Sequence, residues 1–305
     1  MSFETIIDSD YTQAVDARLA SSDAYIEYQM QEARRAIPFL SRFFLIQDAR
    51  VLEIGTGRGG KGIAYANAGM KVTALDVDLP SLELGEQAAQ ECRAGIHFLA
   101  GDGAALPFLQ EYFDAILLDS VIEHVHDPQA LLRECKRVLK RGGIVFVVFP
   151  PYYGPLSGHI DDYIMIPWFH LLPRWVVRKT LLARSQRVGI LTSRDSFDVY
   201  TTLNGLTIFR FKQMACRSGL AIDYLRVRPF LTHPGMRLAA GLASAIRQSP
   251  RGQKLHMVFS RARREFDLRT AVLFVILSAI SPLILVPIAQ EIAGGGCKAV
   301  LRKPL

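Results

Sequence analysis

The sequence predicts an α/β fold in which a mostly parallel sheet is covered by helices on both faces. Between residues 50 and 150, five short segments rich in Val, Ile, Leu or Phe alternate with stretches of helical pattern. Parallel strands need long crossover connections, and their burial on both faces makes them continuous apolar runs. The chain has 305 residues and 50% of them are hydrophobic, which is enough to bury the core of such a sheet.

An N-terminal helical segment, residues 1–45, precedes the sheet. Apolar side chains recur at helical spacing over residues 24–45, and Pro38 is expected to start a second helix there. The five predicted strands follow within residues 46–150 and are RVLEIG (50–55), KVTALD (71–76), IHFLAGD (96–102), FDAILLDS (113–120) and GIVFVVFP (143–150).

The helix predicted before the fifth strand, residues 127–140, has sequence signals at both ends. Asp127 suits the N-cap position, because its side chain can accept a hydrogen bond from the first turn. Pro128 suits the first helical position, and the sequence RGG follows Lys140 at the predicted end.

The alternation is lost over residues 151–206, which are rich in aromatic residues and proline. We interpret this stretch as a cap insertion, apolar inside and basic outside. Residues 207–305 then complete the sheet. They contain an amphipathic helix ended by Gly219, a strand at 220–228, an apolar helical insertion at about 232–290, and a last strand in CKAVLRKPL (297–305).

Charge is distributed unevenly along the chain. Residues 1–132 carry nine Lys/Arg against 20 Asp/Glu, a net charge of −11, whereas residues 133–305 carry a net charge of +18. A basic half can face nucleic acid, anionic lipid or an acidic ligand, or it can be a solvated surface.

The four cysteines are far apart, and no CxxC or Cys–His pair occurs at ligand spacing. This pattern indicates neither a metal site nor a disulfide framework, and it suits a reducing cytoplasm. The first residues carry acidic side chains and no apolar run, so we expect no secretory signal.

The stretch VLEIGTGRGG (51–60) joins the first strand to a glycine-rich turn. Gly55, Gly57 and Gly60 match the G-x-G-x-x-G dinucleotide pattern, which is a weak signal alone. Glu53 lies two residues before the first glycine, and Asp76 ends the second strand. A carboxylate at Glu53 is a poor neighbour for a pyrophosphate and a good one for a cationic amino-acid group, so the pattern favours a ligand other than a nicotinamide dinucleotide.

Five segments in order, VLEIGTGRGG, VTALD, AGDGAALPF, FDAILLDSVIEHVHDP and LKRGGIVFVVFP, resemble the motifs of class I S-adenosylmethionine-dependent methyltransferases. The nearest group is the type 11-like small-molecule methyltransferases. The resemblance covers roughly residues 45–150 and resumes weakly at 207–228. It implies a Rossmann-like sheet of seven strands, mostly parallel with a reversed last strand, plus helical insertions.

The same resemblance implies S-adenosylmethionine as the cofactor and assigns residues to it. Glu53, Gly55, Gly57 and Gly59 would line its methionine end, and Asp76 would accept hydrogen bonds from the ribose. Asp102 and Gly103 would lie at the adenine edge, and Asp119 with Ser120 near the sulfonium. Asp102 also has a purely structural interpretation as a turn or cap aspartate, and a structural role stays open for Asp119 as well.

Two stretches are candidates to border the transferred methyl group. Glu123 and His124 follow the fourth strand at the edge where open α/β sheets bind ligands. The proline- and glycine-rich stretch 150–168 leaves the fifth strand and contains His159. We expect His159 to be a general base oriented by Asp161 or Asp162, although a structural role in a lid is an open alternative for these residues.

The aromatic and apolar composition of the cap favours a small lipophilic or aromatic acceptor, with O-methylation slightly ahead of C-methylation. Two other functions stay open: a non-catalytic protein that keeps the cofactor fold, and RNA modification, which rests on the basic half alone. PPYY (150–153) resembles the motif of nucleic-acid amino-methyltransferases. It follows the fifth strand rather than the fourth, however, and Phe149 before it cannot accept a hydrogen bond.

Residues 271–290 contain no charged side chain, and a run of this length can cross a bilayer. Pro282 and Pro287 interrupt it, and basic residues flank both ends, which opposes a single span. We expect this run either to contact a membrane surface or to pack on the protein itself. The expected location is therefore cytoplasmic, peripheral to a membrane if the run meets lipid.

Overall fold

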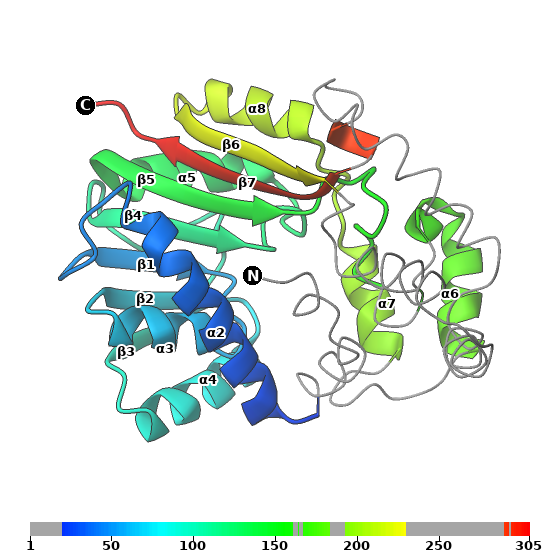
Figure 1. Cartoon of the computed structure of the whole chain (residues 1–305), viewed down its shortest axis with the longest axis horizontal. Helices are drawn as coiled ribbons and strands as arrows, with labels where there is room; N and C mark the ends of the chain where they lie inside the picture. The colour runs from blue at the N-terminus through cyan, green and yellow to red at the C-terminus, as the bar shows by residue number, and fades with distance from the viewer. Residues whose placement is uncertain (1–19, 161–163, 165–166, 184–192, 230–289, 293) are drawn as a thin grey trace, which may run out of the picture. The chain divides into compact units, whose positions relative to one another are not determined.

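A computed structural model describes residues 20–160, 164, 167–183, 193–229, 290–292 and 294–305 (Figure 1). The chain divides into two compact units. The described residues of the larger unit are 20–149, 202–226 and 297–305. Those of the smaller unit lie within 150–201, 227–229 and 290–296.

The larger unit is built on a seven-stranded sheet with the order β3-β2-β1-β4-β5-β7-β6 (Figure 1). Strands β1 to β5 pair in parallel, and β7 runs antiparallel to β5, with Phe149 opposite Cys297. The expected Rossmann-like sheet with a reversed last strand is confirmed. The strands are β1 (Arg50–Ile54), β2 (Lys71–Asp76), β3 (Ile96–Ala100), β4 (Phe113–Asp119), β5 (Leu139–Phe149), β6 (Ala221–Pro229) and β7 (Gly294–Arg302).

Helices cover both faces of this sheet. Figure 1 shows α2 across one face and α5 behind the other. The helices of the larger unit are α2 (Ser22–Leu40), α3 (Gly60–Asn67), α4 (Leu79–Glu91), α5 (Pro128–Val138) and α8 (Ile208–Arg217). The smaller unit contains the short 3₁₀ helix η2 (Phe169–Leu171), α6 (Arg174–Ala183) and α7 (Ser193–Thr201).

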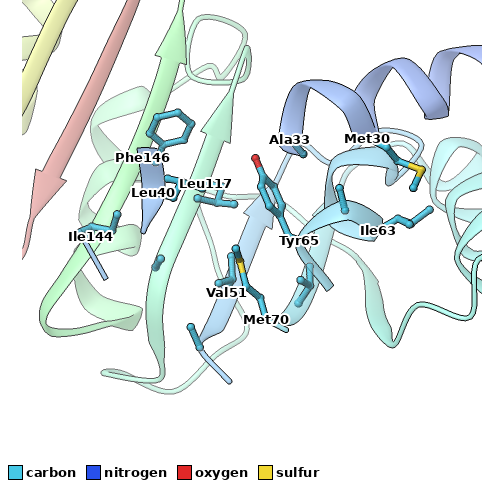
Figure 2. Packing of buried hydrophobic residues seen from close by; sticks show 14 of the residues in the cluster. Met30, Ala33, Leu40, Val51, Ile63, Tyr65, Met70, Leu117, Ile144 and Phe146 are labelled. Atoms are coloured by element: carbon cyan, nitrogen blue, oxygen red, sulfur yellow. The ribbon is translucent and has the colours of Figure 1, made fainter. Parts of the chain in front are cut away.

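The core between α2, α3 and the sheet is drawn in Figure 2. Alternate residues of the strands point to it, such as Leu117 of β4 and Phe146 of β5, because successive side chains of a strand face opposite sides. Tyr65 of α3 and Met30 of α2 close the cluster from the helical side. Each such buried side chain contributes roughly 1.5–3 kcal/mol to stability.

The N-terminal helix differs from the prediction at Pro38. This proline lies inside α2, in its last turn, and does not start a second helix. It removes one backbone hydrogen bond, but Leu40 two residues later is fully buried in the core. Helices in proteins owe most of their stability to such packing, which explains why the helix continues past the proline.

The junction of α5 and β5 also differs from the prediction. Asp127 caps α5 as expected, since its carboxylate accepts the Ala130 N–H at 2.9 Å. The helix ends at Val138, however, and Leu139 is already extended and pairs with Phe113 in the sheet. The register then shifts until Ile144 pairs with Ala115. Full burial of Leu139 in the sheet outweighs continuation of the helix.

Within the described part of the chain, no helix is long and apolar enough to span a bilayer. Residues 271–289 of the charge-free run lie outside the described residues.

Candidate active site

The loop after β1 turns at three glycines with left-handed backbone conformation. Gly55, Gly57 and Gly59 have φ angles of 71°, 54° and 72°, a region that glycine enters without strain. The Gly55 N–H donates to the carbonyl of Leu75 at 2.7 Å, and the Gly57 N–H donates to the carboxylate of Asp76 at 2.6 Å. The loop is therefore held against the carboxyl end of β2.

The three glycines differ in what surrounds them. A Cβ atom at Gly57 would meet nothing within 4 Å, so this residue borders open space. A Cβ atom at Gly59 would lie 2.8 Å from the ring of Phe98, and one at Gly55 would lie 2.3 Å from Val121. Gly57 thus leaves room in front of the loop for an elongated ligand such as the predicted cofactor, while Gly55 and Gly59 permit close packing around it.

Asp76 connects two turns at the end of β2. Its two carboxylate oxygens accept N–H groups from Gly57 and from Asp78, the latter at 3.0 Å. An ionised carboxylate can accept about four hydrogen bonds, so it retains capacity for the two hydroxyl groups of a ribose. Val77, which follows, is 76% exposed and places an apolar surface beside it. The sequence prediction missed Val77; an apolar residue directly after the strand-ending acid is the signal that could have found it.

The turn after β3 carries Asp102 and Gly103. Asp102 is exposed, and its carboxylate accepts the Ala104 N–H at 2.8 Å, which is the geometry of a local turn. Gly103 is buried, and a Cβ there would lie 2.8 Å from Leu131 and 3.0 Å from Ile54. The backbone therefore approaches the end of β1 closely at this position.

A polar cluster lies behind the glycine loop. Glu53 is buried and accepts a hydrogen bond from the Thr56 hydroxyl at 2.9 Å. Burial raises the pKa of Glu53 to about 7, although the nearby charge of Lys61 opposes this. The ammonium of Lys61 lies 2.7 Å from the carboxylate of Asp119 at the end of β4. The sequence prediction missed Lys61, because a lysine among glycines at a helix start has the pattern of a solvated residue.

The loop after β4 is held by residues far along the chain. The Nδ1 atom of His124 lies 2.7 Å from the hydroxyl of Thr202, and Glu123 is buried beside it. The Asn204 side-chain amide donates to the carbonyls of Ile122 and Val125, both at 2.8 Å. Its backbone N–H donates to the carbonyl of Glu123 at 2.9 Å. Asn204 was missed by the prediction, and the Asn-Gly turn signal at 204–205 is its only local mark.

His159 belongs to the smaller unit and has a left-handed backbone with φ of 53°. Near it, His170 is buried and its Nε2 atom lies 2.8 Å from the carbonyl of Tyr152. Burial lowers the pKa of His170, and the neighbouring His159 lowers it further. The indole N–H of Trp168 donates to the carbonyl of Tyr153 at 3.0 Å, which closes this stretch on itself.

The structure gathers most of the predicted site residues at one edge of the larger unit. The residues expected to bind the cofactor lie in the last two residues of strands β1, β2 and β4 or in the turns that follow β1, β3 and β4, and His124 lies in the loop after β4. This is the edge where open α/β sheets bind ligands. His159 is in the smaller unit, and Asp161 and Asp162 lie outside the described residues. The role of each residue stays a prediction.

Residues 52–147, the part of the chain that forms this edge, match the family model of a methyltransferase domain. The match identifies this region, and not the whole chain, as similar to a methyltransferase domain. Over 118 residues the chain is 37% identical to a demethylmenaquinone methyltransferase of Renibacterium salmoninarum. The aligned stretch covers 38% of the chain and 48% of that relative. Over 116 residues it is 34% identical to a ubiquinone biosynthesis O-methyltransferase of Parvibaculum lavamentivorans, which covers 38% of the chain and 43% of that relative.

The fold of the chain also resembles solved structures. The structure of geranyl diphosphate methyltransferase in complex with SAM aligns with 97% of the chain and 91% of its own length, at 14% identity and a TM-score of 0.54. At this identity the likeness supports the fold alone. The chain spans about half the length of the curated relatives it matches. The expected resemblance to class I, type 11-like S-adenosylmethionine-dependent methyltransferases is confirmed for residues 52–147.

Proposed function

We propose that the whole protein is a methyltransferase that uses S-adenosylmethionine. The observation that carries this proposal is the hydrogen bond from the Gly57 N–H to the carboxylate of Asp76 at the carboxyl edge of the sheet. Gly57 also borders open space. The methionine end of the cofactor can approach the loop backbone there. The remaining hydrogen-bond acceptor capacity of Asp76 suits the ribose hydroxyls. The neighbouring exposed Val77 offers an apolar contact for a base.

We propose a small lipophilic or aromatic acceptor of the phenol or hydroquinone class. Two relatives are named for menaquinone and ubiquinone chemistry, which favours such an acceptor. The smaller unit carries the aromatic side chains Tyr152, Tyr153, Trp168 and Trp175, which suit contacts to a flat apolar molecule. We place O-methylation ahead of C-methylation, since a phenolic oxygen is the simpler nucleophile.

The bound cofactor would supply a methyl group activated by positive sulfur. The protein has to align the acceptor with that methyl group and exclude water, and such alignment is worth about 7–11 kcal/mol of the barrier. A hydroxyl nucleophile also loses a proton, and a ring nitrogen of His159 or His124 is the proposed recipient. A general base of this kind contributes typically about 10²–10⁴-fold.

Titration calorimetry of the full chain with S-adenosylhomocysteine tests the cofactor part of the proposal. Incubation with methyl-labelled cofactor and extracts of lipids and small molecules then tests the acceptor. We expect label in a lipid-soluble product, on oxygen by mass spectrometry and NMR. Label on ring carbon would leave the enzyme class intact and reverse the preference for oxygen.

Two outcomes would favour the other functions. Binding of S-adenosylhomocysteine without transfer to any acceptor would support a non-catalytic role for the cofactor fold. RNA binding that weakens steeply with salt, together with label in RNA, would support RNA modification, because contacts to phosphates depend on ionic strength.

We further propose that residues 151–206 form a substrate cap and that residues 271–290 contact a membrane surface or pack against the protein. A lipophilic acceptor partitions into membranes, which gives such contact a purpose. Cell fractionation tests this: a peripheral protein is released from membranes by high salt or an alkaline wash. Retention after both washes would contradict a peripheral association.

A further inference from the structure

Lys61, near the start of α3, is a lysine with a largely buried side chain that the proposed chemistry does not use. Its ammonium pairs with Asp119 at 2.7 Å, and only 17% of the lysine side chain is exposed. Burial lowers the pKa of Lys61, but the ion pair with Asp119 and the charge of Glu53 together raise it above its ordinary value. The charged form is therefore maintained inside the protein.

The charge of Lys61 acts on two carboxylates at once. Asp119 ends β4, and Glu53 lies on the adjacent strand β1, opposite Leu117. The Lys61 charge lowers the pKa of Glu53, while the charge of Asp119 raises it. One ammonium thus forms an ion pair with Asp119 and acts electrostatically on Glu53, two acidic groups on neighbouring strands.

This cluster is attached directly to the cofactor loop. The hydroxyl of Thr56, a residue of that loop, donates to Glu53 at 2.9 Å. A Cβ atom at Gly62 would lie 2.8 Å from the same carboxylate, so Glu53 points under α3. Any shift of Glu53 or Asp119 therefore moves either the loop or the end of β4, both at the edge where the cofactor is proposed to bind.

We propose that Lys61 is a positioning residue for the cofactor site: it holds Asp119 at the end of β4 and compensates Glu53 beneath the glycine loop, and so determines the affinity of the site and its dependence on pH. This inference rests on the proposed function. A lysine that served the fold alone would affect stability and leave the pH dependence of binding unchanged.

The groups that titrate around this lysine come from five elements. Glu53 and Asp119 are on strands β1 and β4, Asp76 ends β2, Tyr65 is on α3, and Tyr25 and Glu32 approach from α2. Burial raises the pKa of Tyr65 well above its ordinary value, so it stays neutral. Glu53, with a pKa of about 7, is the group that changes charge near neutral pH.

The test is calorimetry of the full chain with S-adenosylhomocysteine across about pH 5.5 to 8.5, a range that brackets the pKa of Glu53. In the wild-type protein, the affinity for S-adenosylhomocysteine should change with pH, and the midpoint of this change should lie near pH 7. In Lys61→Met the midpoint should rise by about one unit or more, because the opposite charge that lowers the pKa of Glu53 is lost. Affinity at neutral pH should fall at least about tenfold, and Lys61→Arg should restore the wild-type midpoint.

Lys71→Met is the matched control. Lys71 pairs with Asp48 at 3.0 Å, but both side chains are 65% exposed, and Lys71 begins β2, at the opposite edge of the sheet. Asp119→Asn is a second variant that does not depend on Lys61→Met remaining folded. It removes the charge that raises the pKa of Glu53, so the midpoint should fall.

The outcomes separate this inference from the proposed function. If the wild-type protein binds S-adenosylhomocysteine and folded Lys61→Met binds it with the same affinity and midpoint, the inference is overturned and the function stands. An Asp119→Asn midpoint that does not move also overturns it. A wild-type protein that binds no S-adenosylhomocysteine overturns the proposed function and this inference with it.

Discussion

The carboxylate of Asp76 lies 2.6 Å from the backbone nitrogen of Gly57 and accepts its N–H, which joins the end of β2 to the loop after β1. The two residues are 19 positions apart in the sequence. One is predicted to bind the cofactor ribose and the other to line its methionine end. Substitutions of Gly57 and of Asp76 can therefore be compared for their effects on cofactor binding and on stability.

Asp76→Ala should weaken S-adenosylhomocysteine binding at least about tenfold, because it removes both a ribose acceptor and the bond that holds the loop. Losing hydrogen bonds to a charged group should also lower the free energy of unfolding by about 1.5–3 kcal/mol. Calorimetry and urea unfolding measure the two effects. Asp48→Ala, at the opposite edge of the sheet, is the control and should leave affinity unchanged. An equal affinity for Asp76→Ala and wild type would remove Asp76 from the cofactor site.

Gly57→Ala should reduce cofactor affinity more than it reduces stability. The left-handed conformation costs about 1–2 kcal/mol for alanine, and the new methyl group would occupy the open space in front of the loop. Gly205→Ala is a matched control, since Gly205 also has a positive φ, of 73°, and open space around its Cβ position. Both variants should lose similar stability, and only Gly57→Ala should lose affinity for S-adenosylhomocysteine. Loss of affinity in both would indicate a general effect of strain.

His159→Ala should reduce turnover at least about tenfold while cofactor affinity stays intact, because a general base acts on the acceptor and not on the cofactor. Steady-state rates with the labelled cofactor and calorimetry measure the two properties. His126→Ala, an exposed histidine in the loop after β4, is the control and should retain wild-type turnover. An unchanged rate for His159→Ala would exclude His159 as the base and leave His124 as the candidate.

Glu53→Gln should change how stability depends on pH. Burial raises the pKa of Glu53 from its ordinary 4.5 to about 7, so between these values the folded chain binds more protons than the unfolded chain. The contribution of Glu53 to stability is therefore full below about pH 4.5 and is lost as the pH rises through about 7, by at most about 3 kcal/mol. Glutamine is neutral at every pH, so the free energy of unfolding of the variant should not show this decline between about pH 5 and 8. Urea unfolding measures it.

Glu86→Gln, at an exposed position of α4, serves as the control for that experiment. Its stability should follow the wild-type curve. Identical slopes for wild type and Glu53→Gln would show that Glu53 is ionised in the folded protein across this range.

Strand and cap predictions succeeded where the signal is local. The segment KVTALD was predicted as a strand and forms β2 with the same bounds, Lys71–Asp76. Asp127 was predicted as the N-cap of a helix, and its carboxylate accepts the Ala130 N–H in the first turn of α5. A short apolar run and a capping side chain carry their own information, because burial and first-turn hydrogen bonds act within a few residues.

Predictions failed where distant packing opposes a local rule. Pro38 has the pattern of a helix start, yet the burial of Leu40 keeps it inside α2. Leu139 has the pattern of a helix residue, yet its pairing with Phe113 places it in β5. In both places a buried leucine contributes more than the local backbone preference that it overrides.

The polar side chains that support the site were also out of reach of local patterns. Asn204 contacts a loop 82 residues earlier through Ile122, and Lys61 reaches Asp119 on another strand. The order of motifs along the chain is sufficient for the sheet, the glycine loop and the class of enzyme domain, because each motif is a continuous segment with its own physical signal. The tertiary structure alone decides which charged side chains meet behind that loop. Ion pairs and hydrogen bonds between distant residues form only when the assembled sheet brings those residues together.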